Sequence, residues 1–265
     1  MIEIDLSGRL ALVTGSSDGI GNAAARGFLG AGADVAVNGR SPEKVARIAE
    51  ELRAQFPGRA VIEAPGDVGS KAGCDAVTAQ VPRCDILVNN VAVIAREDAL
   101  DASDETYREL WDINFMSALR MSRFYLPGML ERNWGRILFS GSQRGLMAYK
   151  GGTPYMASKI AQLSLARSLA DVTRGTRVTV NTVMIGLSHS ASLDAVATEM
   201  AAAKGRTQEE DEQDFIDLVA PASLQRRLTR PEEIANFMVY LASPLASATN
   251  GAVLSAEGGT RQAIW

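Results

Sequence analysis

The feature that most constrains the fold is a glycine-rich turn between a short apolar run and a helical pattern. Leu10–Val13 is apolar throughout, which is typical of a strand buried in a parallel sheet. The next residues, Thr14–Gly21, include Gly15, Gly19 and Gly21, and apolar residues then recur at helical spacing. Backbone N–H groups and the helix dipole at such a turn attract a phosphate, which glycines let approach closely. The pattern predicts a dinucleotide site, with an ordinary tight turn as the alternative.

Apolar runs alternate with helical patterns along the rest of the chain, which indicates a parallel sheet with crossover helices. No internal repeat or linker interrupts the 265 residues. We therefore expect one α/β domain over residues 1–265, a doubly wound Rossmann-type sheet of seven strands with helices on both faces. Its ligand site should lie at the carboxyl ends of the strands. The expected strands are Leu10–Thr14, Asp34–Val37, Ala60–Ala64, Ile86–Val88, Arg136–Ser140, Arg177–Val183 and Val253–Ser255.

Composition excludes several classes of function. The net charge of −4 argues against nucleic acid or an anionic membrane as the main partner. Two cysteines and one histidine leave no ligand set for a structural zinc and no disulfide framework. We expect no signal peptide, and no apolar stretch reaches about 20 residues. We expect a cytoplasmic protein that holds no metal.

Three side chains form a candidate catalytic set. Tyr155 and Lys159 are four residues apart, so they share one face of a helix. A nearby cation lowers the pKa of a phenol, which in water is too high for acid–base work at neutral pH. The hydroxyl of Ser142 could hold a substrate oxygen while Tyr155 exchanges a proton with it. Alone, however, this spacing is common on solvated helices.

Together with the glycine turn, these residues resemble the short-chain dehydrogenase/reductase family over nearly the whole chain. The resemblance implies an NAD(P)-dependent oxidoreductase that transfers a hydride between nicotinamide and a carbonyl or secondary alcohol. It makes Tyr155 the general acid/base, Lys159 the group that lowers its pKa and holds the ribose, and Ser142 the group that orients the substrate oxygen. Asn114 would position a relay water. The matching segments also include Asn89-Asn90-Val91-Ala92, Asn181-Thr182-Val183-Met184-Ile185-Gly186 and Pro231-Glu232-Glu233-Ile234-Ala235.

The resemblance also implies a set of cofactor-binding positions. Among them, Asp67 and Val68 are expected to cap the adenine. The full set is Gly15, Ser17, Asp18, Gly19, Ile20, Gly21, Asn38, Arg40, Asp67, Val68, Asn90, Ala92, Tyr155, Lys159, Ile185, Gly186 and Ser188.

The sequence departs from the family pattern at three positions. Ala92 replaces a glycine, Ile185 replaces a proline and so predicts a less rigid loop, and Glu257 replaces an aspartate. The four catalytic positions are unchanged, which favours an enzyme. The alternatives are a non-catalytic dinucleotide sensor or scaffold on the same fold, and a structural protein with an incidental glycine turn.

The end of the second strand bears on the choice of cofactor. Gly39 stands where NAD-type relatives carry a carboxylate, and Arg40 follows it with a planar fork that suits a 2′-phosphate. Asp18 opposes this, because its carboxylate would repel that phosphate unless it turns away. We expect NADP to be favoured over NAD.

Residues 187–227 contain no clear strand and follow the expected nicotinamide loop, which predicts a substrate lid. We expect the acidic run Glu209–Glu212 within it to be a solvated helix face. The substrate itself is a small molecule, and a sugar or polyol, a 3-oxoacyl thioester and a ring ketone stay open. The residues expected to line its pocket are Val93, Ile94, Gln143, Arg144, Met147 and Tyr149.

Two segments, 110–125 and 155–169, carry large apolar residues on more than one helix face. Covering the sheet uses one face of each, and the surplus predicts burial against another subunit. Trp265 is a further candidate interface anchor. We expect a homo-oligomer, a homotetramer with two-fold axes, as is common among the relatives.

Overall fold

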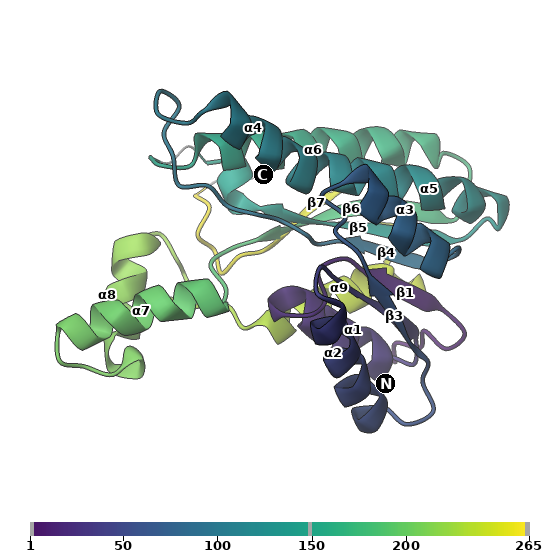
Figure 1. The fold of residues 1–265 in the computed structure, drawn as a ribbon, viewed down its shortest axis with the longest axis horizontal. Helices are drawn as coiled ribbons and strands as arrows, with labels where there is room; N and C mark the ends of the chain where they lie inside the picture. The colour runs from purple at the N-terminus through teal and green to yellow at the C-terminus, as the bar shows by residue number, and fades with distance from the viewer. Residues whose placement is uncertain (1–2, 148–149, 263–265) are drawn as a thin grey trace.

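The computed structural model describes residues 3–147 and 150–262. Within these residues, seven strands form one parallel sheet in the order β3-β2-β1-β4-β5-β6-β7, which confirms the expected doubly wound fold (Figure 1). The chain builds outward from β1 in one direction and from β4 in the other, so the topological switch point lies between these two strands. The strands are β1 (Leu10–Val13), β2 (Asp34–Gly39), β3 (Val61–Pro65), β4 (Ile86–Asn89), β5 (Gly135–Ser142), β6 (Val178–Ile185) and β7 (Val253–Ala256).

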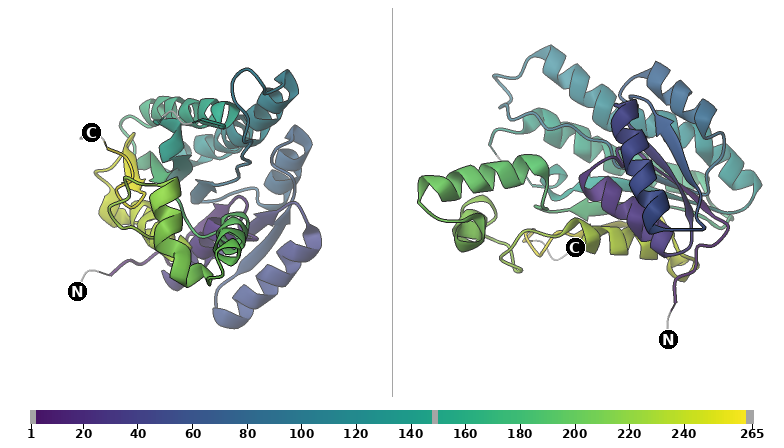
Figure 2. Two further views of the ribbon diagram at one scale, coloured as in Figure 1. Left: turned by 90° about the vertical axis from the view of Figure 1, so that its left-hand side faces the viewer. Right: turned by 60° about the horizontal axis from the view of Figure 1, so that its bottom comes forward.

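Helices cover both faces of the sheet (Figures 1 and 2). Side chains alternate along each strand, so Ala11 and Val13 pack on one face and Leu12 on the other. The first face is covered by α1 (Gly19–Gly30), α2 (Pro42–Gln55) and α9 (Pro231–Ala242), and the second by α3 (Lys71–Gln80), α5 (Ser117–Glu131) and α6 (Thr153–Val172). Shorter helical segments are α4 (Asp104–Leu110), the π-helical turn η1 (Trp111–Met116), and the 3₁₀ turns η2 (Gln143–Gly145) and η3 (Pro244–Ala246).

An excursion of two helices follows β6. Helices α7 (Ala191–Ala203) and α8 (Gln208–Val219) pack on each other around a small apolar cluster that includes Phe215 and Ile216. They project from the end of the sheet at which β6 finishes (Figure 1). A bridge between Ser188 and Thr229 closes the base of the excursion. No helix in the described part of the chain combines the length and apolarity that crossing a membrane requires.

The acidic run of the excursion is more than a solvated face. Thr207 and Glu210 form a capping box at the start of α8. The side chain of Asp211 is 1% exposed, and both its oxygens accept hydrogen bonds from Lys204 at 2.8 Å. Arg206 lies 3.3 Å from the same carboxylate. The run therefore fixes the connection between α7 and α8.

Candidate active site

The glycine turn is shaped so that only glycine fits at two positions. Gly15 has a φ of 65°, a left-handed backbone conformation that residues other than glycine rarely adopt. A Cβ on Gly21 would lie 2.3 Å from the carbonyl oxygen of Gly15 and 2.7 Å from Nδ2 of Asn90. The first turn of α1 can therefore approach the end of β1 closely, which leaves an open cradle on its outer side.

Two asparagines, Asn38 and the half-buried Asn90, hold this cradle in place. Oδ1 of Asn38 accepts a hydrogen bond from the Gly15 N–H, and its Nδ2 donates to Ala64 and Gly66. Asn90 donates from Nδ2 to the carbonyl of Thr14 at 3.1 Å and to that of Gly15 at 3.4 Å. These contacts tie the ends of β1, β2, β3 and β4 together, so the loop is ordered by the protein itself.

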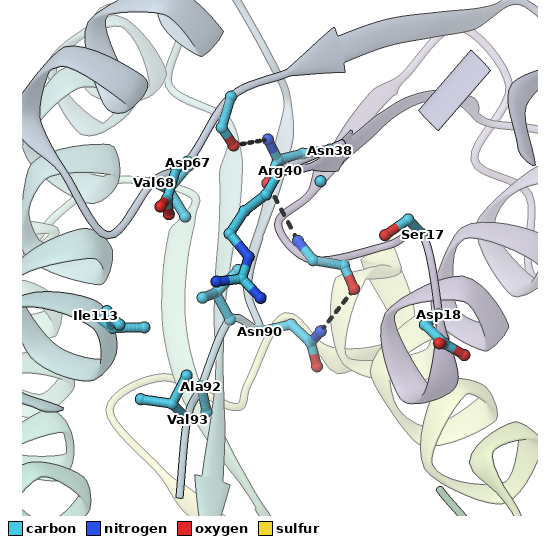
Figure 3. Close-up of a pocket in the computed structure, with 14 residues that line it drawn as sticks. Ser17, Asp18, Asn38, Arg40, Asp67, Val68, Asn90, Ala92, Val93 and Ile113 are labelled. Carbon is cyan, nitrogen blue, oxygen red and sulfur yellow. Dashed lines mark hydrogen bonds between the residues drawn. The ribbon is translucent and has the colours of Figure 1, made fainter. Parts of the chain in front are cut away.

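A cavity of about 320 Å³ opens above the cradle (Figure 3). It contains nine of the predicted cofactor positions, and it adds Ile113, which the sequence did not reveal because it comes from the π-helical turn. The predicted residues that line it are Gly15, Ser17, Asp18, Asn38, Arg40, Asp67, Val68, Asn90 and Ala92.

The contacts of Asp18 bear on whether a 2′-phosphate can bind near Arg40. Arg40 follows the last residue of β2 and extends across the cavity (Figure 3). Asp18 caps α1 through the Gly19 N–H and forms an ion pair of 2.9 Å with Lys44, whose hydrogen bond holds the pKa of the carboxyl below its usual value. The Asp18 charge is thus already compensated. Asp18 no longer argues against a phosphate near Arg40.

A second cavity, of about 250 Å³, adjoins the first through Asn90 and Ala92. Ser142, Tyr155 and Lys159 all line it. Ser142 is the last residue of β5, whereas the other two lie on one face of α6, as the spacing predicted. Four of the remaining cofactor positions also border this cavity: Ile20, Ile185, Gly186 and Ser188. Gly19 borders a neighbouring surface hollow, and Gly21 packs against the Gly15 carbonyl within the cradle.

Lys159 is held deep in the protein. Its side chain is buried, and Nζ donates to the carbonyl of Ser140 at 2.8 Å and to Oε1 of Gln162 at 3.0 Å. Nζ lies 5.9 Å from the centroid of the Tyr155 ring. Burial lowers the pKa of the Lys159 ammonium to about 7, because the charged form is poorly solvated there. Its positive charge beside Tyr155 therefore depends on pH near neutrality.

Asn114 makes contacts that differ from the sequence-based expectation. It is fully buried in the π-helical turn and lines neither cavity. Its Oδ1 accepts from the Val93 N–H at 2.8 Å, and its Nδ2 donates to the Val93 carbonyl and to Oγ of Ser158. The side chain that was expected to position a relay water instead joins the loop after β4 to α6.

The second cavity also has residues that the sequence did not single out. Arg96 and His189 line it beside the predicted Ile94 and Arg144. Nδ1 of His189 lies 2.8 Å from the carboxylate of Asp194 on α7, so its ring is oriented by the excursion. Of the other predicted pocket residues, Val93 lines the first cavity, Gln143 and Met147 line neither, and Tyr149 lies outside the described residues.

The departures from the family pattern have local explanations. Ile185 is not in a loop, because β6 runs through it and pairs it with Ser142 on one side and Ala256 on the other. The expectation of a less rigid loop at this position is therefore wrong. Glu257 accepts hydrogen bonds from the backbone N–H groups of Thr260 and Arg261, and so caps the turn after β7.

Comparisons with known proteins agree with this geometry. The model of the short chain dehydrogenase family matches residues 9–202. The chain is 38% identical over 264 residues to the uncharacterized oxidoreductase YvaG of Bacillus subtilis, which covers all of both chains. It is 33% identical to a 3-oxoacyl-acyl-carrier-protein reductase of Vibrio harveyi, over 97% of this chain and 98% of that protein.

Among solved structures, the L-sorbose reductase of Gluconobacter frateurii, complexed with NADPH and L-sorbose, superimposes with a TM-score of 0.92. It is 31% identical and the match covers 99% of this chain and all of that one. The glycine cradle, the parallel sheet and the match along the whole chain lead to one conclusion: this chain belongs to the short-chain dehydrogenase/reductase family and is an NAD(P)-dependent oxidoreductase.

Proposed function

We propose that this chain is an NADP-dependent oxidoreductase that interconverts a small polar carbonyl compound and its secondary alcohol. The observation that carries the proposal is that Ser142, Tyr155 and Lys159 border one cavity, which adjoins the cavity above the glycine cradle. Two adjoining cavities suit an elongated dinucleotide whose reactive end lies beside the three side chains. Gly15 and Gly21 allow the close backbone approach that forms the cradle, because a side chain at Gly15 would be strained and one at Gly21 would clash with the Gly15 carbonyl.

Each of the three side chains has a separate role in proton transfer. Tyr155 donates its phenol proton to the substrate oxygen during reduction and removes it during oxidation. Ser142 holds the same oxygen with its hydroxyl, while the charged form of Lys159 favours the phenolate and its ammonium holds the nicotinamide ribose. The cofactor, when bound, supplies or accepts the hydride.

The second cavity favours a hydroxyl-rich substrate. Arg96, Arg144 and His189 line it together with Ser142, and these groups suit the hydroxyls of a sugar or polyol. Similarity to the L-sorbose reductase supports the same class. We therefore favour a sugar or polyol over the 3-oxoacyl thioester of the Vibrio harveyi relative and over a ring ketone.

A substrate panel tests the proposed function. The wild-type protein is assayed with ketoses, polyols, a 3-oxoacyl thioester and a ring ketone, each with both cofactors, by the absorbance of reduced nicotinamide. We expect the highest kcat/KM for a ketose–polyol pair with the NADP couple. Preference for the thioester would contradict the substrate class, and no turnover with any pair would contradict the proposed function.

Arg40 is the residue on which the cofactor preference rests. We expect Arg40→Ala to weaken NADPH binding by about tenfold or more, since a hydrogen bond to a charged group is worth about 1.5–3 kcal/mol. NADH binding should change little, because NADH lacks the 2′-phosphate. Both dissociation constants can be measured by quenching of tryptophan fluorescence.

The matched control for this variant is Arg47→Ala. It removes the same charge from α2, where Arg47 pairs with Glu51 on the surface. If Arg40→Ala weakens the binding of NADPH and NADH equally, or if the wild type prefers NADH, then Arg40 does not bind the 2′-phosphate.

The excursion of α7 and α8 acts in this proposal as the substrate lid. Leu187, His189 and Leu193 at its base line the second cavity. The rest of the excursion packs on its own apolar cluster. A lid built in this way can change its angle to the sheet without disrupting the core.

We also propose that the chain assembles into a homotetramer. Trp111, Phe124 and Ile160 are between 43% and 48% exposed and lie on the two segments expected to form interfaces, whereas Trp265 lies outside the described residues. Light scattering at micromolar concentration should give about four times the 28.2 kDa of one chain. A mass of 28.2 kDa would exclude assembly, and a stable dimer would limit it to one of the two surfaces.

A further inference from the structure

A chain of buried polar groups lies behind Lys159, on the side away from the cavity. Gln162 is on α6, three residues after Lys159, and its side chain is 1% exposed. Its Oε1 accepts a hydrogen bond from Nζ of Lys159 at 3.0 Å, and its Nε2 donates to the backbone carbonyl of Asn114 at 2.5 Å. One side-chain amide thus bridges Lys159 and the backbone of Asn114, the residue that the family resemblance implies would position a relay water.

The orientation of this amide is fixed by chemistry. The Asn114 carbonyl can only accept a hydrogen bond, and a charged Lys159 can only donate. A flipped Gln162 would place oxygen against oxygen and one N–H donor against another. The π-helical turn directs the Asn114 carbonyl toward α6, and π-helical turns are often found at functional sites.

The same contacts fix the positions around Nζ of Lys159. A tetrahedral amine nitrogen has three positions besides its carbon, and the Ser140 carbonyl and Gln162 Oε1 occupy two of them. A neutral amine can satisfy both with its two N–H groups. The third position, which gains or loses the proton, is then the one left for the cavity that Lys159 lines.

We propose that Gln162 is a positioning residue that takes the place of a relay water, closes the route behind Lys159 and keeps the exchangeable proton of Nζ on the cavity side. A side-chain amide neither gains nor loses a proton near neutral pH, so it cannot pass a proton toward Asn114. The catalytic meaning of this arrangement depends on the proposed function, but the coupling of Gln162 to Lys159 does not.

The surroundings of Lys159 make that coupling measurable. Among the residues that the structure describes, the titratable side chains that share its cavity are Tyr155, Arg96, Arg144 and His189, and none of them is a carboxylate. On the π-helical turn packed against α6, Asp112 is exposed and paired with Arg120. Gln162 Oε1 is therefore one of two neutral acceptors for a cation whose pKa burial lowers to about 7.

The first test uses folding and needs no substrate. The unfolded chain keeps its lysine proton up to about pH 10.4, so the stability of the wild type should rise with pH once the folded protein begins to lose the Lys159 proton near pH 7. In Gln162→Glu, the added carboxylate should move this onset at least about one pH unit higher. In Gln162→Met, loss of the acceptor should move it lower.

Opposite shifts are the signature of the proposal, because general damage to packing would not move the onset in two directions. Urea unfolding of each variant from pH 5.5 to 9.5 gives the onset. Ser164→Glu is the matched control, since it adds the same charge to an exposed position of α6 and should leave the onset in place. Shifts in the same direction, or none, would overturn the proposal.

The second test concerns turnover. Gln162→Met should lower kcat for carbonyl reduction about tenfold, the worth of one hydrogen bond to a charged group. Gln162→Glu keeps the acceptor for Lys159 and loses only the donor to the Asn114 carbonyl, so it should lower kcat less. The alkaline limb of the pH profile should follow the onset seen in unfolding. Unchanged kcat in Gln162→Met would overturn the catalytic part. If the wild type reduces no substrate, the proposed function fails while the unfolding result stands.

Discussion

Replacing Tyr155 by phenylalanine is expected to lower kcat at least about 100-fold while NADPH binding stays nearly unchanged. The variant loses the hydroxyl that, in the proposed mechanism, exchanges a proton with the substrate oxygen, and general acid–base catalysis contributes about 10²–10⁴-fold. The ring stays the same size, so its packing against Lys159 is preserved. Steady-state turnover and cofactor fluorescence on the same preparation separate the two effects.

The control is Tyr240→Phe. Tyr240 is a partly exposed residue of α9, and the change removes the same hydroxyl far from the second cavity. It should leave kcat and cofactor binding as they are. Turnover near that of the wild type in Tyr155→Phe would rule out Tyr155 as the acid/base.

The second large effect concerns the stability of Lys159→Met. The pKa of Lys159 is about 7 in the folded protein and about 10.4 in an unfolded chain. Below pH 7 both states are protonated, so the penalty of the buried charge is fully present, and it shrinks as pH rises toward 10. The free energy of unfolding of the wild type relative to Lys159→Met should therefore rise by about 2–3 kcal/mol from pH 6 to pH 9.

Urea unfolding of both proteins at the two pH values measures this difference. Lys71→Met is the comparison, because Lys71 is exposed on α3 and pairs only with Asp75 among the described residues. The difference in the free energy of unfolding between Lys71→Met and the wild type should change little with pH. If the difference in the free energy of unfolding between the wild type and Lys159→Met is the same at both pH values, then Lys159 stays charged over this range and its pKa is not lowered.

The strands could be read from the sequence because each is a compact apolar run, but the carboxyl ends of β2, β5 and β6 could not, since each strand continues two residues beyond its predicted range. The run at β5 appeared to stop at Ser140, since Gly141 is a common strand breaker. In the fold, β5 continues through Gly141 to Ser142, and a Cβ at Gly141 would come within 2.6 Å of Thr182 on β6. Glycine there permits close pairing, which extends the sheet to Ser142.

The site was predictable where side chains follow a motif and unpredictable where backbone groups decide. Ser142, Tyr155 and Lys159 were predicted from their spacing together with the family resemblance, and they border one cavity. The contact of Gln162 depends on a π-helical turn that directs the Asn114 carbonyl toward α6, and no residue type predicts such a turn. His189 reaches the cavity only because the base of the excursion is closed by a bridge between distant residues.

The close packing of Gly39 against Ser17 constrains how cofactor preference could change during evolution. A Cβ at position 39 would lie 2.7 Å from Oγ of Ser17 and 3.1 Å from a methyl of Val45. An aspartate at 39, the single change that would give this strand end an NAD-type carboxylate, would first have to displace the serine. A carboxylate at position 39 therefore requires Ser17 to move or to be replaced, which couples the two positions.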